Sequence, residues 1–477
     1  MKSQQLLSKK AILTWLSGLF ILTSASAQTP CVGGMAGVYP CHDVDLVSYL
    51  SNANTGGGNG NDVWGWTSPT GREFVIYGKS TGTAFIEITI PTAPAYKGFL
   101  PTHTTNSTWR DIKVYADHAF IVSEAGNHGM QIFDLTQLLP QDSYPLTFTE
   151  TAYYDGFGDA HNIVINEESA RAYAVGTNTF GGGLHIMDIS DPLNPVLIGD
   201  FTEGGYVHDA QVVIYNGPDA DYIGREIAMC CNGSSFKIAD VTNASDVVQL
   251  ATTGYTGQGY IHQGWLTDDH KYFLLGDEGD ENGSGVNTTT YIWDVQDLTD
   301  PQLIGSFVST EAAIDHNQYI TGGFNFQSNY RAGLRILDIE NVANAVLTEV
   351  AFFDVVPADN NAGFSGSWSN YPYFPSGHVA VTSIGDGIFL VKPNALEGCT
   401  DPSSSNYSAV ASVDDGSCDA QGCAADYNND NVVNTQDLLI LLSEFGCVSG
   451  CLYDLDGDDI VNTQDLLIFL AQFGSPC

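Results

Sequence analysis

Acidic and amide side chains recur twice, at fixed spacing, near the C-terminal end of the chain. The segments DYNNDNVVNTQD from Asp426 and DLDGDDIVNTQD from Asp454 begin 28 residues apart. Each has oxygen-bearing side chains at positions 1, 3, 5, 9 and 12 and a backbone carbonyl at position 7, which is how a loop wraps oxygen ligands around Ca²⁺. The predicted ligands are Asp426, Asn428, Asp430, Val432, Asn434 and Asp437 in the first loop, and Asp454, Asp456, Asp458, Ile460, Asn462 and Asp465 in the second. We therefore expect calcium as a cofactor of this tail, the alternative being an acidic turn that holds no metal.

Four histidines recur much earlier in the chain, each at the start of a short β-type segment. They are His161, His208, His262 and His316. Histidine beside carboxylate can bind a transition metal or act as acid and base. Further polar residues expected on the same face are Asp62, Asp111, Asp277, Glu278 and Arg331. A structural role is the alternative, because a polar residue that recurs with a repeat can cap the backbone of the neighbouring repeat.

One loop, Gly276 to Gly285, is crowded with acidic residues. It carries Asp277, Glu278, Asp280 and Glu281, which could form a second calcium site or a solvated acidic turn. The sequence contains no nucleophile elbow at a strand-to-helix turn, no phosphate-binding loop and no HExxH motif, so the common hydrolase, kinase and zinc-protease chemistries have no support in it.

The elements that must position these residues are β-strands. GGLHIMDISDPLNPVLIGDF, from Gly182, predicts two strands joined by a tight turn. Variants follow Thr83, Ser235, Thr289 and Gly333. Repetition of an all-β unit punctuated by turns is typical of a β-propeller in which each copy is one blade.

Counting the strands predicts seven blades and the way in which the ring closes. Seven segments have the pattern of a first strand, and they start at Asn61, Trp109, His161, His208, Ile261, Asp315 and Ser367. The last blade lacks a fourth strand, whereas Val44 to Leu50 has the fourth-strand pattern and precedes the first blade. An N-terminal strand that completes the last blade would leave no open edge. First strands are innermost in a propeller, so the four histidines should converge at one mouth of the central channel. The opposite face should carry solvated connectors.

These segments resemble the choice-of-anchor B family, secreted bacterial proteins with repeats of the LVIVD type. The matching motifs include WRDIKVYADHAFIVSEAGNHGMQIFDL, VHDAQVVIYNGPDADYIGRE and IHQGWLTDDHKYFLLGDE. The resemblance covers about Cys31 to Pro393. It implies a propeller and differing C-terminal attachment modules, but no reaction and no catalytic residue. The propeller is predicted to span residues 28–393, with 44–50 completing the last blade by the strand count above.

Composition indicates an exported protein. Residues 1–27 have the basic start, apolar core and Ala-Ser-Ala end of a signal peptide, and no later run is apolar enough to span a membrane. The formal net charge is -41, with 15 basic against 56 acidic residues, which disfavours nucleic acid as a partner. Export permits disulfides. The cysteines expected to form them are Cys31, Cys41, Cys399, Cys418, Cys423, Cys447, Cys451 and Cys477, whereas Cys230 and Cys231 are expected to be buried strand thiols.

The end of the chain divides into two small units. Residues 397–418 form a spacer that depends on a Cys399–Cys418 bridge, and residues 423–477 contain the duplicated calcium loops. Each loop leads into a helix, and Leu438, Leu439, Leu442 and Phe445 of one should pack on Leu466, Leu467, Leu470 and Phe473 of the other. The duplication resembles a type I dockerin. Asn431 and Asp459 replace the glycine usual at position 6, and the helices lack the basic residues of cohesin-binding dockerins.

The favoured function is a secreted or cell-surface recognition propeller that binds a protein or glycan and is attached through the calcium-stabilised tail. An enzyme, such as a metal-dependent hydrolase or lactonase at the channel mouth, is one alternative, and it rests on fold-level analogy. An accessory subunit of a polysaccharide-degrading complex with a cohesin-like partner is another.

Overall fold

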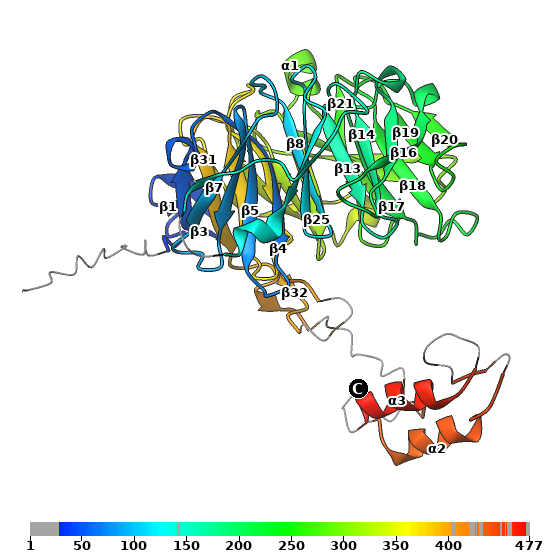
Figure 1. Ribbon diagram of the computed structural model, residues 1–477. Coiled ribbons are helices and arrows are strands. Elements are labelled where there is room, and N and C mark those ends of the chain that lie inside the picture. Colours follow the sequence, from blue (N-terminus) through cyan, green and yellow to red (C-terminus); the bar gives the residue numbers. More distant parts are fainter. Residues whose placement is uncertain are drawn as a thin grey trace, which may run out of the picture.

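Seven small antiparallel sheets form the body of the protein and are arranged as the blades of a propeller (Figure 1). The computed structural model describes residues 28–140, 144–401, 404, 407–416, 418, 425, 427–428, 433–448, 451–453, 455 and 460–473. The predicted signal peptide, residues 1–27, lies outside this part of the chain, as do Cys423 and Cys477. The predicted seven-bladed propeller is confirmed.

Each blade consists of four strands that run from the channel to the rim. The first strands are β4 (Gly60–Thr67), β8 (Arg110–Tyr115), β13 (Asn162–Asn166), β17 (Asp209–Ile214), β21 (Ile261–Leu266), β25 (Asn317–Thr321) and β29 (Ser367–Tyr371). The second strands are β5 (Glu73–Lys79), β9 (His118–Ser123), β14 (Arg171–Val175), β18 (Glu226–Cys231), β22 (Tyr272–Asp277), β26 (Phe324–Ser328) and β30 (Val379–Ser383). The third strands are β6 (Gly82–Glu87), β10 (Met130–Asp134), β15 (Leu184–Asp188), β19 (Phe236–Asp240), β23 (Thr289–Asp294), β27 (Leu334–Asp338) and β31 (Gly387–Pro393). The outer strands are β7 (Ala95–Pro101), β12 (Ala152–Tyr154), β16 (Val196–Phe201), β20 (Val248–Thr253), β24 (Gln302–Val308), β28 (Thr348–Phe353) and β3 (Val44–Ser51).

The hydrophobic core lies between blades rather than at the centre of the ring. Tyr173 and Ile186 of the third blade pack with Ala228 and Cys230 of the fourth in one buried cluster. The second and third strands are covered on both faces by neighbouring blades, which explains their nearly continuous apolar sequences. Cys230 and Cys231 are buried free thiols on β18, as predicted.

The N-terminal segment closes the ring as predicted, and it engages two blades. Strand β3 pairs antiparallel with β31 and so supplies the fourth strand of the seventh blade. Just before it, β2 (Tyr39–His42) pairs with β28 at the rim of the sixth blade, and β1 (Met35–Ala36) adds to β2. The Cys31–Cys41 disulfide links the two ends of this short excursion.

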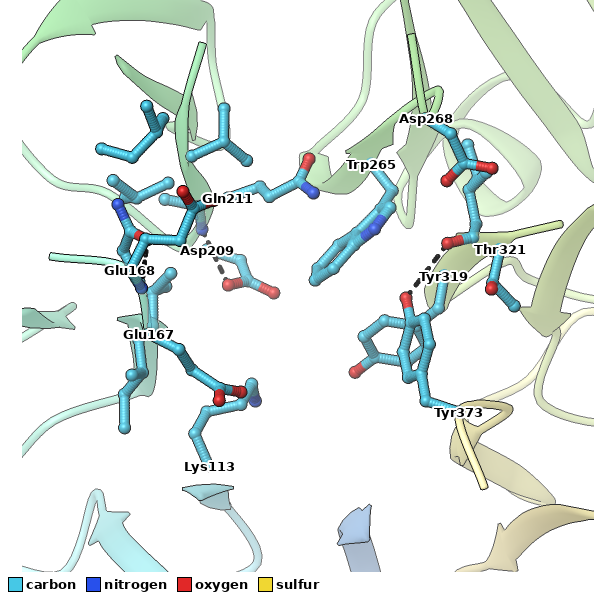
Figure 2. Close-up of a pocket in the computed structure, with 18 of the residues that line it drawn as sticks. Lys113, Glu167, Glu168, Asp209, Gln211, Trp265, Asp268, Tyr319, Thr321 and Tyr373 are labelled. Atoms are coloured by element: carbon cyan, nitrogen blue, oxygen red, sulfur yellow. Dashed lines mark hydrogen bonds between the residues drawn. The ribbon is translucent and has the colours of Figure 1, made fainter. Parts of the chain in front are cut away.

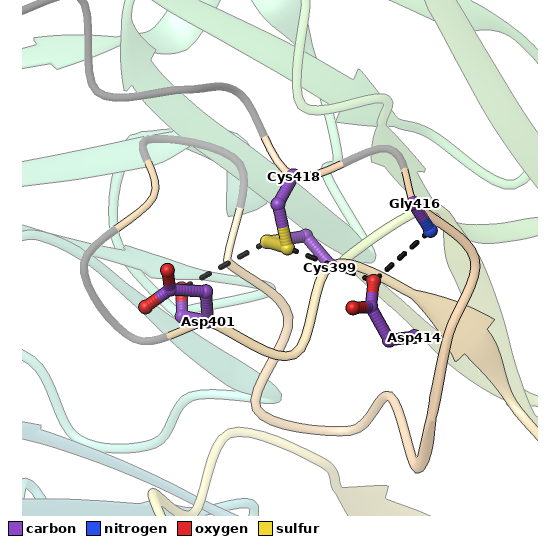
Figure 3. The surroundings of a disulfide bond; sticks show 5 residues. All are labelled: Cys399, Asp401, Asp414, Gly416 and Cys418. Atoms are coloured by element: carbon purple, nitrogen blue, oxygen red, sulfur yellow. Dashed lines mark hydrogen bonds between the residues drawn. A yellow bond between two sulfur atoms is a disulfide. The ribbon is translucent and has the colours of Figure 1, made fainter. Parts of the chain in front are cut away.

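The small cysteine unit is attached to the propeller and is more than a spacer. Strand β32 (Glu397–Gly398) pairs parallel with β33 (Val413–Asp414), and the predicted Cys399–Cys418 disulfide is formed beside them (Figure 3). Leu396 and Val410 are buried in the same cluster as residues of the sixth and seventh blades. Val410 of the unit and Leu396 just before it therefore extend the propeller core, whereas Tyr407 and Val413 are exposed.

Two helices, α2 (Thr435–Ser443) and α3 (Thr463–Gln472), follow the predicted calcium loops. The predicted contact between them is only partly right. Leu441 and Phe469 are fully buried, with Leu438 and Leu466 packed against them. The equivalent pairs that remain exposed are Leu439 and Leu467, Leu442 and Leu470, and Phe445 and Phe473. The 3.6-residue period thus gives each helix two apolar faces, of which one is covered.

The further disulfide in the described part of the tail joins Cys447 to Cys451. Short strand β11 (Leu146–Thr147) adds to the rim of the first blade, and α1 (Asp280–Ser284) caps a loop of the fifth. Among the described residues, none of the helices has the length and hydropathy needed to cross a bilayer.

Removing residues 28–50 tests the closure. The deletion exposes the hydrogen-bonding edge of β31 and the rim of β28, and an unpaired edge promotes association. We expect a large fall in melting temperature together with aggregation in size-exclusion chromatography. The matched control is Cys31→Ser with Cys41→Ser, which keeps the strands and loses only the bridge, at a cost of about 3 kcal/mol. A monomeric deletion variant as stable as this control would contradict the closing role of β3.

Candidate functional site

The four predicted histidines meet at one mouth of the channel. His161, His208, His262 and His316 line a single cavity of about 360 Å³, together with Glu278 and aromatic residues. Neighbouring rings lie 4.1, 4.3 and 4.4 Å apart between centroids, in chain order. His161, His208 and His316 immediately precede a first strand and His262 is the second residue of one, so the ring of blades places them side by side. The geometric prediction that they converge is therefore confirmed.

Two of these histidines also bridge adjacent blades. His208 Nδ1 donates to the carbonyl of His262 at 3.0 Å, and His316 Nδ1 donates to the carbonyl of Trp368 at 2.5 Å. This is the structural role that the sequence left open. A histidine that donates through Nδ1 leaves Nε2 as an acceptor. The structural role and a ligand role are therefore compatible within one side chain.

Glu278 lies between two of the histidines. Its carboxylate oxygens are 3.8 Å from His262 Nε2 and 3.8 Å from His316 Nε2. Tyr330 donates a hydrogen bond of 2.7 Å to Glu278 Oε1. Tyr330 has a φ of 35°, which is rare for a bulky side chain, and strained residues of this kind concentrate at functional sites.

Burial controls protonation in this cavity. Burial raises the pKa of Glu278 to about 7, against the opposing effect of the Tyr330 hydrogen bond. Burial lowers the pKa of His316 to about 3, and it lowers the pKa values of His208 and His262 well below the usual range, with their histidine neighbours adding to the effect. His208, His262 and His316 are therefore neutral at physiological pH, which is the form that binds metals.

The rest of the acidic loop does not form the predicted solvated turn. Asp277, Asp280 and Glu281 are all buried. Asp277 accepts hydrogen bonds from Tyr255 and from the backbone of Gly259, and Asp280 accepts one from Tyr291. Burial raises the pKa of Asp280 to about 6 and that of Glu281 to about 9. The hydrogen bonds of Asp277 and Asp280 hold the loop against the protein, and Glu278 is the residue of this loop that lines the cavity.

Arg331 lies apart from the histidines. It donates to Ser365 Oγ and forms an ion pair of 2.9 Å with Asp359. The sequence predicts Arg331 on this face, but Arg331 is not among the residues that line the cavity.

Asp62 and Asp111 belong to a separate buried cluster further along the first strands. Lys113 Nζ lies 2.7 Å from Asp111 and 3.8 Å from Asp62. Burial and the Asp111 charge raise the pKa of Asp62 well above the usual range, which favours its neutral form, and the Lys113 charge opposes this. Burial also raises the pKa of Asp209, the third carboxyl near Lys113, to about 7. The cluster thus holds one lysine and more carboxyl groups than it can neutralise by charge.

A second cavity, of about 560 Å³, opens at the other end of the channel. Figure 2 shows Trp265, Tyr319 and Tyr373 on one side, facing Asp209, Gln211, Glu167 and Lys113 across an open space. We call this the aromatic cavity. Trp64, Trp265, Tyr319 and Tyr371 occupy the same place in four first strands, and that repetition was a signal in the sequence. The prediction of solvated connectors on this face missed the cavity because it considered turns and not channel-facing residues.

In the described part of the tail, the last carboxylate of each predicted calcium loop lies in the first turn of the helix that follows. Asp437 and Asp465 are fully buried. Each accepts backbone hydrogen bonds from its own loop, Asp437 from Asn428 and Asn434 and Asp465 from Leu455 and Asn462. Asn434 and Asn462 cap α2 and α3. The predicted ligands Asp426, Asp430, Val432, Asp454, Asp456 and Asp458 lie outside the described residues.

Comparison with known proteins gives a family match over one blade and distant similarity to many solved structures, of which two are described. A family model described as LVIVD repeat matches residues 158–203, which span the third blade. No curated protein matches the chain. A protein from Lactobacillus plantarum is similar with 15% identity over 64% of this chain and 85% of that chain, with a TM-score of 0.46. Kuenenia stuttgartiensis hydrazine synthase is similar with 13% identity over 68% of this chain and 93% of that chain, with a TM-score of 0.49.

The Asp209 carboxyl gives a pH prediction. Its pKa is about 7 in the folded protein, against an ordinary value of about 4 in the unfolded chain. Between these values the folded state binds more protons, so this group stabilises the fold at low pH and the contribution is lost as pH rises towards 7. Asp209→Asn should therefore reduce the loss of unfolding free energy between pH 5 and pH 8, measured by denaturant titration. A loss equal to or greater than that of the unchanged chain would contradict this assignment.

Proposed function

We propose that the protein is an extracellular recognition propeller that binds a glycan in the aromatic cavity. The observation that supports this most directly is the meeting of aromatic rings and hydrogen-bonding groups in one concave site on the channel axis. Pockets of this composition, apolar walls with a few placed polar groups, are typical ligand sites. The concave shape favours a chain end or a single sugar ring over a flat protein surface.

The aromatic wall is held rigid by edge contacts. Between ring centroids, Tyr319 lies 5.1 Å from Trp265 and 5.9 Å from Trp64, both in T-shaped geometry, and Trp64 lies 5.1 Å from Tyr371. Trp64 and Trp265 are half-buried, so each is anchored and still presents surface to the cavity. The C–H face of a sugar ring packs on such surfaces, and a rigid wall loses little entropy on binding.

The opposite wall supplies hydrogen-bonding groups for hydroxyls. Carboxylates accept hydrogen bonds, amides both donate and accept, and hydroxyls can satisfy either. Glu167 is exposed at the rim, whereas Asp209 and Gln211 are deeper. Lys113 Nζ lies 4.6 Å from the centroid of the Trp64 ring, which restrains the lysine at the base of the cavity. A neutral polyol suits this wall better than an anion, because the carboxyl groups outnumber the lysine.

Location and attachment complete the proposal. The disulfides Cys31–Cys41, Cys399–Cys418 and Cys447–Cys451 fit an oxidising compartment. With the N-terminal signal-like segment, they support secretion and membership of the choice-of-anchor B proteins. The tail acts as a dockerin-like attachment module, held by two calcium ions. The exposed apolar residues at equivalent positions of α2 and α3 support docking of the tail onto a partner.

Metal-dependent hydrolysis in the histidine cavity is the second candidate function. The convergence of His262, His316 and Glu278 favours it, and the remaining space of the cavity would accept a small substrate. This function requires a metal ion at those three residues.

The glycan proposal predicts separable losses of binding. Trp265→Ala should weaken binding of a glycan identified on an array by about tenfold or more, about 1.4 kcal/mol. Glu167→Gln, at the exposed rim, should weaken it less. Tyr153→Ala removes an exposed ring from outer strand β12 and serves as the control. Isothermal titration calorimetry measures all three. Failure of the unchanged protein to bind any array glycan, or equal affinities for Trp265→Ala and the control, would contradict the proposal.

The tail predicts calcium-dependent folding of two loops. Asp437→Ala and Asp465→Ala should each abolish one calcium site and leave the other, because each loop has its own carboxylate at position 12. Free calcium at a hundred times the dissociation constant should stabilise the tail by about 2.7 kcal/mol per site. Equilibrium dialysis counts the ions, and circular dichroism with and without chelator follows the helices. The prediction would be contradicted if the helicity does not change when chelator is added, or if either variant still binds two calcium ions.

A further inference from the structure

We infer that His262, His316 and Glu278 form a binding site for one divalent first-row transition-metal ion. The inference is independent of glycan binding in the aromatic cavity, and the second candidate function above rests on it. Three donor atoms, one from each side chain, lie within 4.8 Å of one another. They come from three separate elements, since His262 is on β21, Glu278 follows β22, and His316 precedes β25. The fold of two adjacent blades therefore assembles the site.

The distances suit an ion better than direct contact. The separations of 3.8 Å between the Glu278 oxygens and the two Nε2 atoms are too long for hydrogen bonds. Metal–ligand bonds of about 2.0 to 2.2 Å place neighbouring donor atoms about 3 to 3.5 Å apart. Small movements of the three side chains towards one another would thus bring them to an ion placed between them.

The surroundings prepare these side chains as ligands. The Nδ1 of His316 is held by the Trp368 carbonyl, which directs Nε2 to the cavity, and metal-bound histidines are usually oriented in this way. The hydroxyl of Tyr330 holds Glu278 Oε1, which is the corresponding support for a carboxylate ligand. His262 is 2% exposed, and its imidazole has a weak hydrogen-bond partner in the backbone of His316.

The donor set identifies the class of ion. Two imidazoles and one carboxylate suit zinc, iron, manganese and copper, whereas calcium and magnesium prefer oxygen ligands alone. His208 and His161 line the same cavity and leave room for a further ligand or for solvent. Trp109, Trp368 and Phe364 line the remainder, so the open side of the ion would face a largely apolar space.

The test is cobalt binding by the intact chain in excess calcium. Chelator-treated protein is titrated with Co²⁺ while millimolar Ca²⁺ occupies the tail, and visible absorption bands and equilibrium dialysis are recorded. One equivalent of bound Co²⁺ with imidazole-type spectra is expected. His262→Ala combined with His316→Ala should abolish binding, and His42→Ala, which changes an exposed histidine outside the cavity, should preserve it. Asp437→Ala combined with Asp465→Ala should also preserve it, which excludes the tail.

Tyr330→Phe decides the matter if the double histidine variant fails to fold. It removes no ligand and should weaken Co²⁺ binding by about tenfold to a hundredfold through loss of support for Glu278. The melting curve without metal shows whether this variant keeps its fold. The inference is overturned if the unchanged chain binds no stoichiometric Co²⁺ in calcium, if the folded double histidine variant binds as the His42 control does, or if Tyr330→Phe binds with unchanged affinity.

Discussion

Side-chain bridges between blades are the interaction on which the rest of this structure depends. Each blade is a separate sheet, so no backbone hydrogen bonds join neighbouring first strands in a ladder. The backbone N–H and C=O groups on the channel side of each first strand therefore need side chains as hydrogen-bond partners. Asn162 donates to the His208 carbonyl, His208 donates to the His262 carbonyl, and Gln263 exchanges two hydrogen bonds with the backbone of Gln318. The same polar residue types recur because each blade faces the same problem. In this protein the residues that solve it also line the channel, so structure and recognition share side chains.

An acidic protein that buries carboxyl groups must keep many of them neutral. Asp62 beside Lys113, Glu281 beside Asp280, and Asp315 are all buried groups whose pKa is raised, by burial first and by neighbouring carboxylates next. Transfer of an unpaired charge into the interior is far more costly than protonation. A bound cation would shift the equilibrium between the protonated and ionised forms most strongly at such groups. Around Glu278 the nearby groups are neutral imidazoles with available lone pairs, which makes that carboxylate differ from the others.

The sequence predicts those features that depend on repetition or on counting. Seven first strands, a closing strand at Val44 to Leu50 (observed as Val44–Ser51) and the meeting of the histidines all follow from placing equal units in a ring. It is harder to predict from the sequence which side chains are buried and in which layer of the channel they lie. Asp277 and Asp280 have the composition of a solvated turn, yet tyrosine hydroxyls from other segments draw them inward. Asp62 and Asp111 were grouped with the histidines, although each lies one position further along its strand and so belongs to another layer. In α2 the apolar pattern identifies Leu439 and Leu441 equally well, and only the partner helix decides that Leu441 is buried.

The layers explain how one channel can contain two independent sites. Successive positions on a strand advance by about 3.3 Å, and alternate side chains face the same way. Along β17 and its approach, His208 faces the histidine cavity, Asp209 belongs to the lysine cluster, and Gln211 lines the aromatic cavity. The charged layer thus forms the base of the aromatic cavity and separates that cavity, suited to a polyol, from the mouth suited to a metal. Because the two cavities share strands but no lining residues, a change of ligand specificity at one mouth need not alter the other. The blade bridges fix the strands, and the side chains between the bridges remain free to vary.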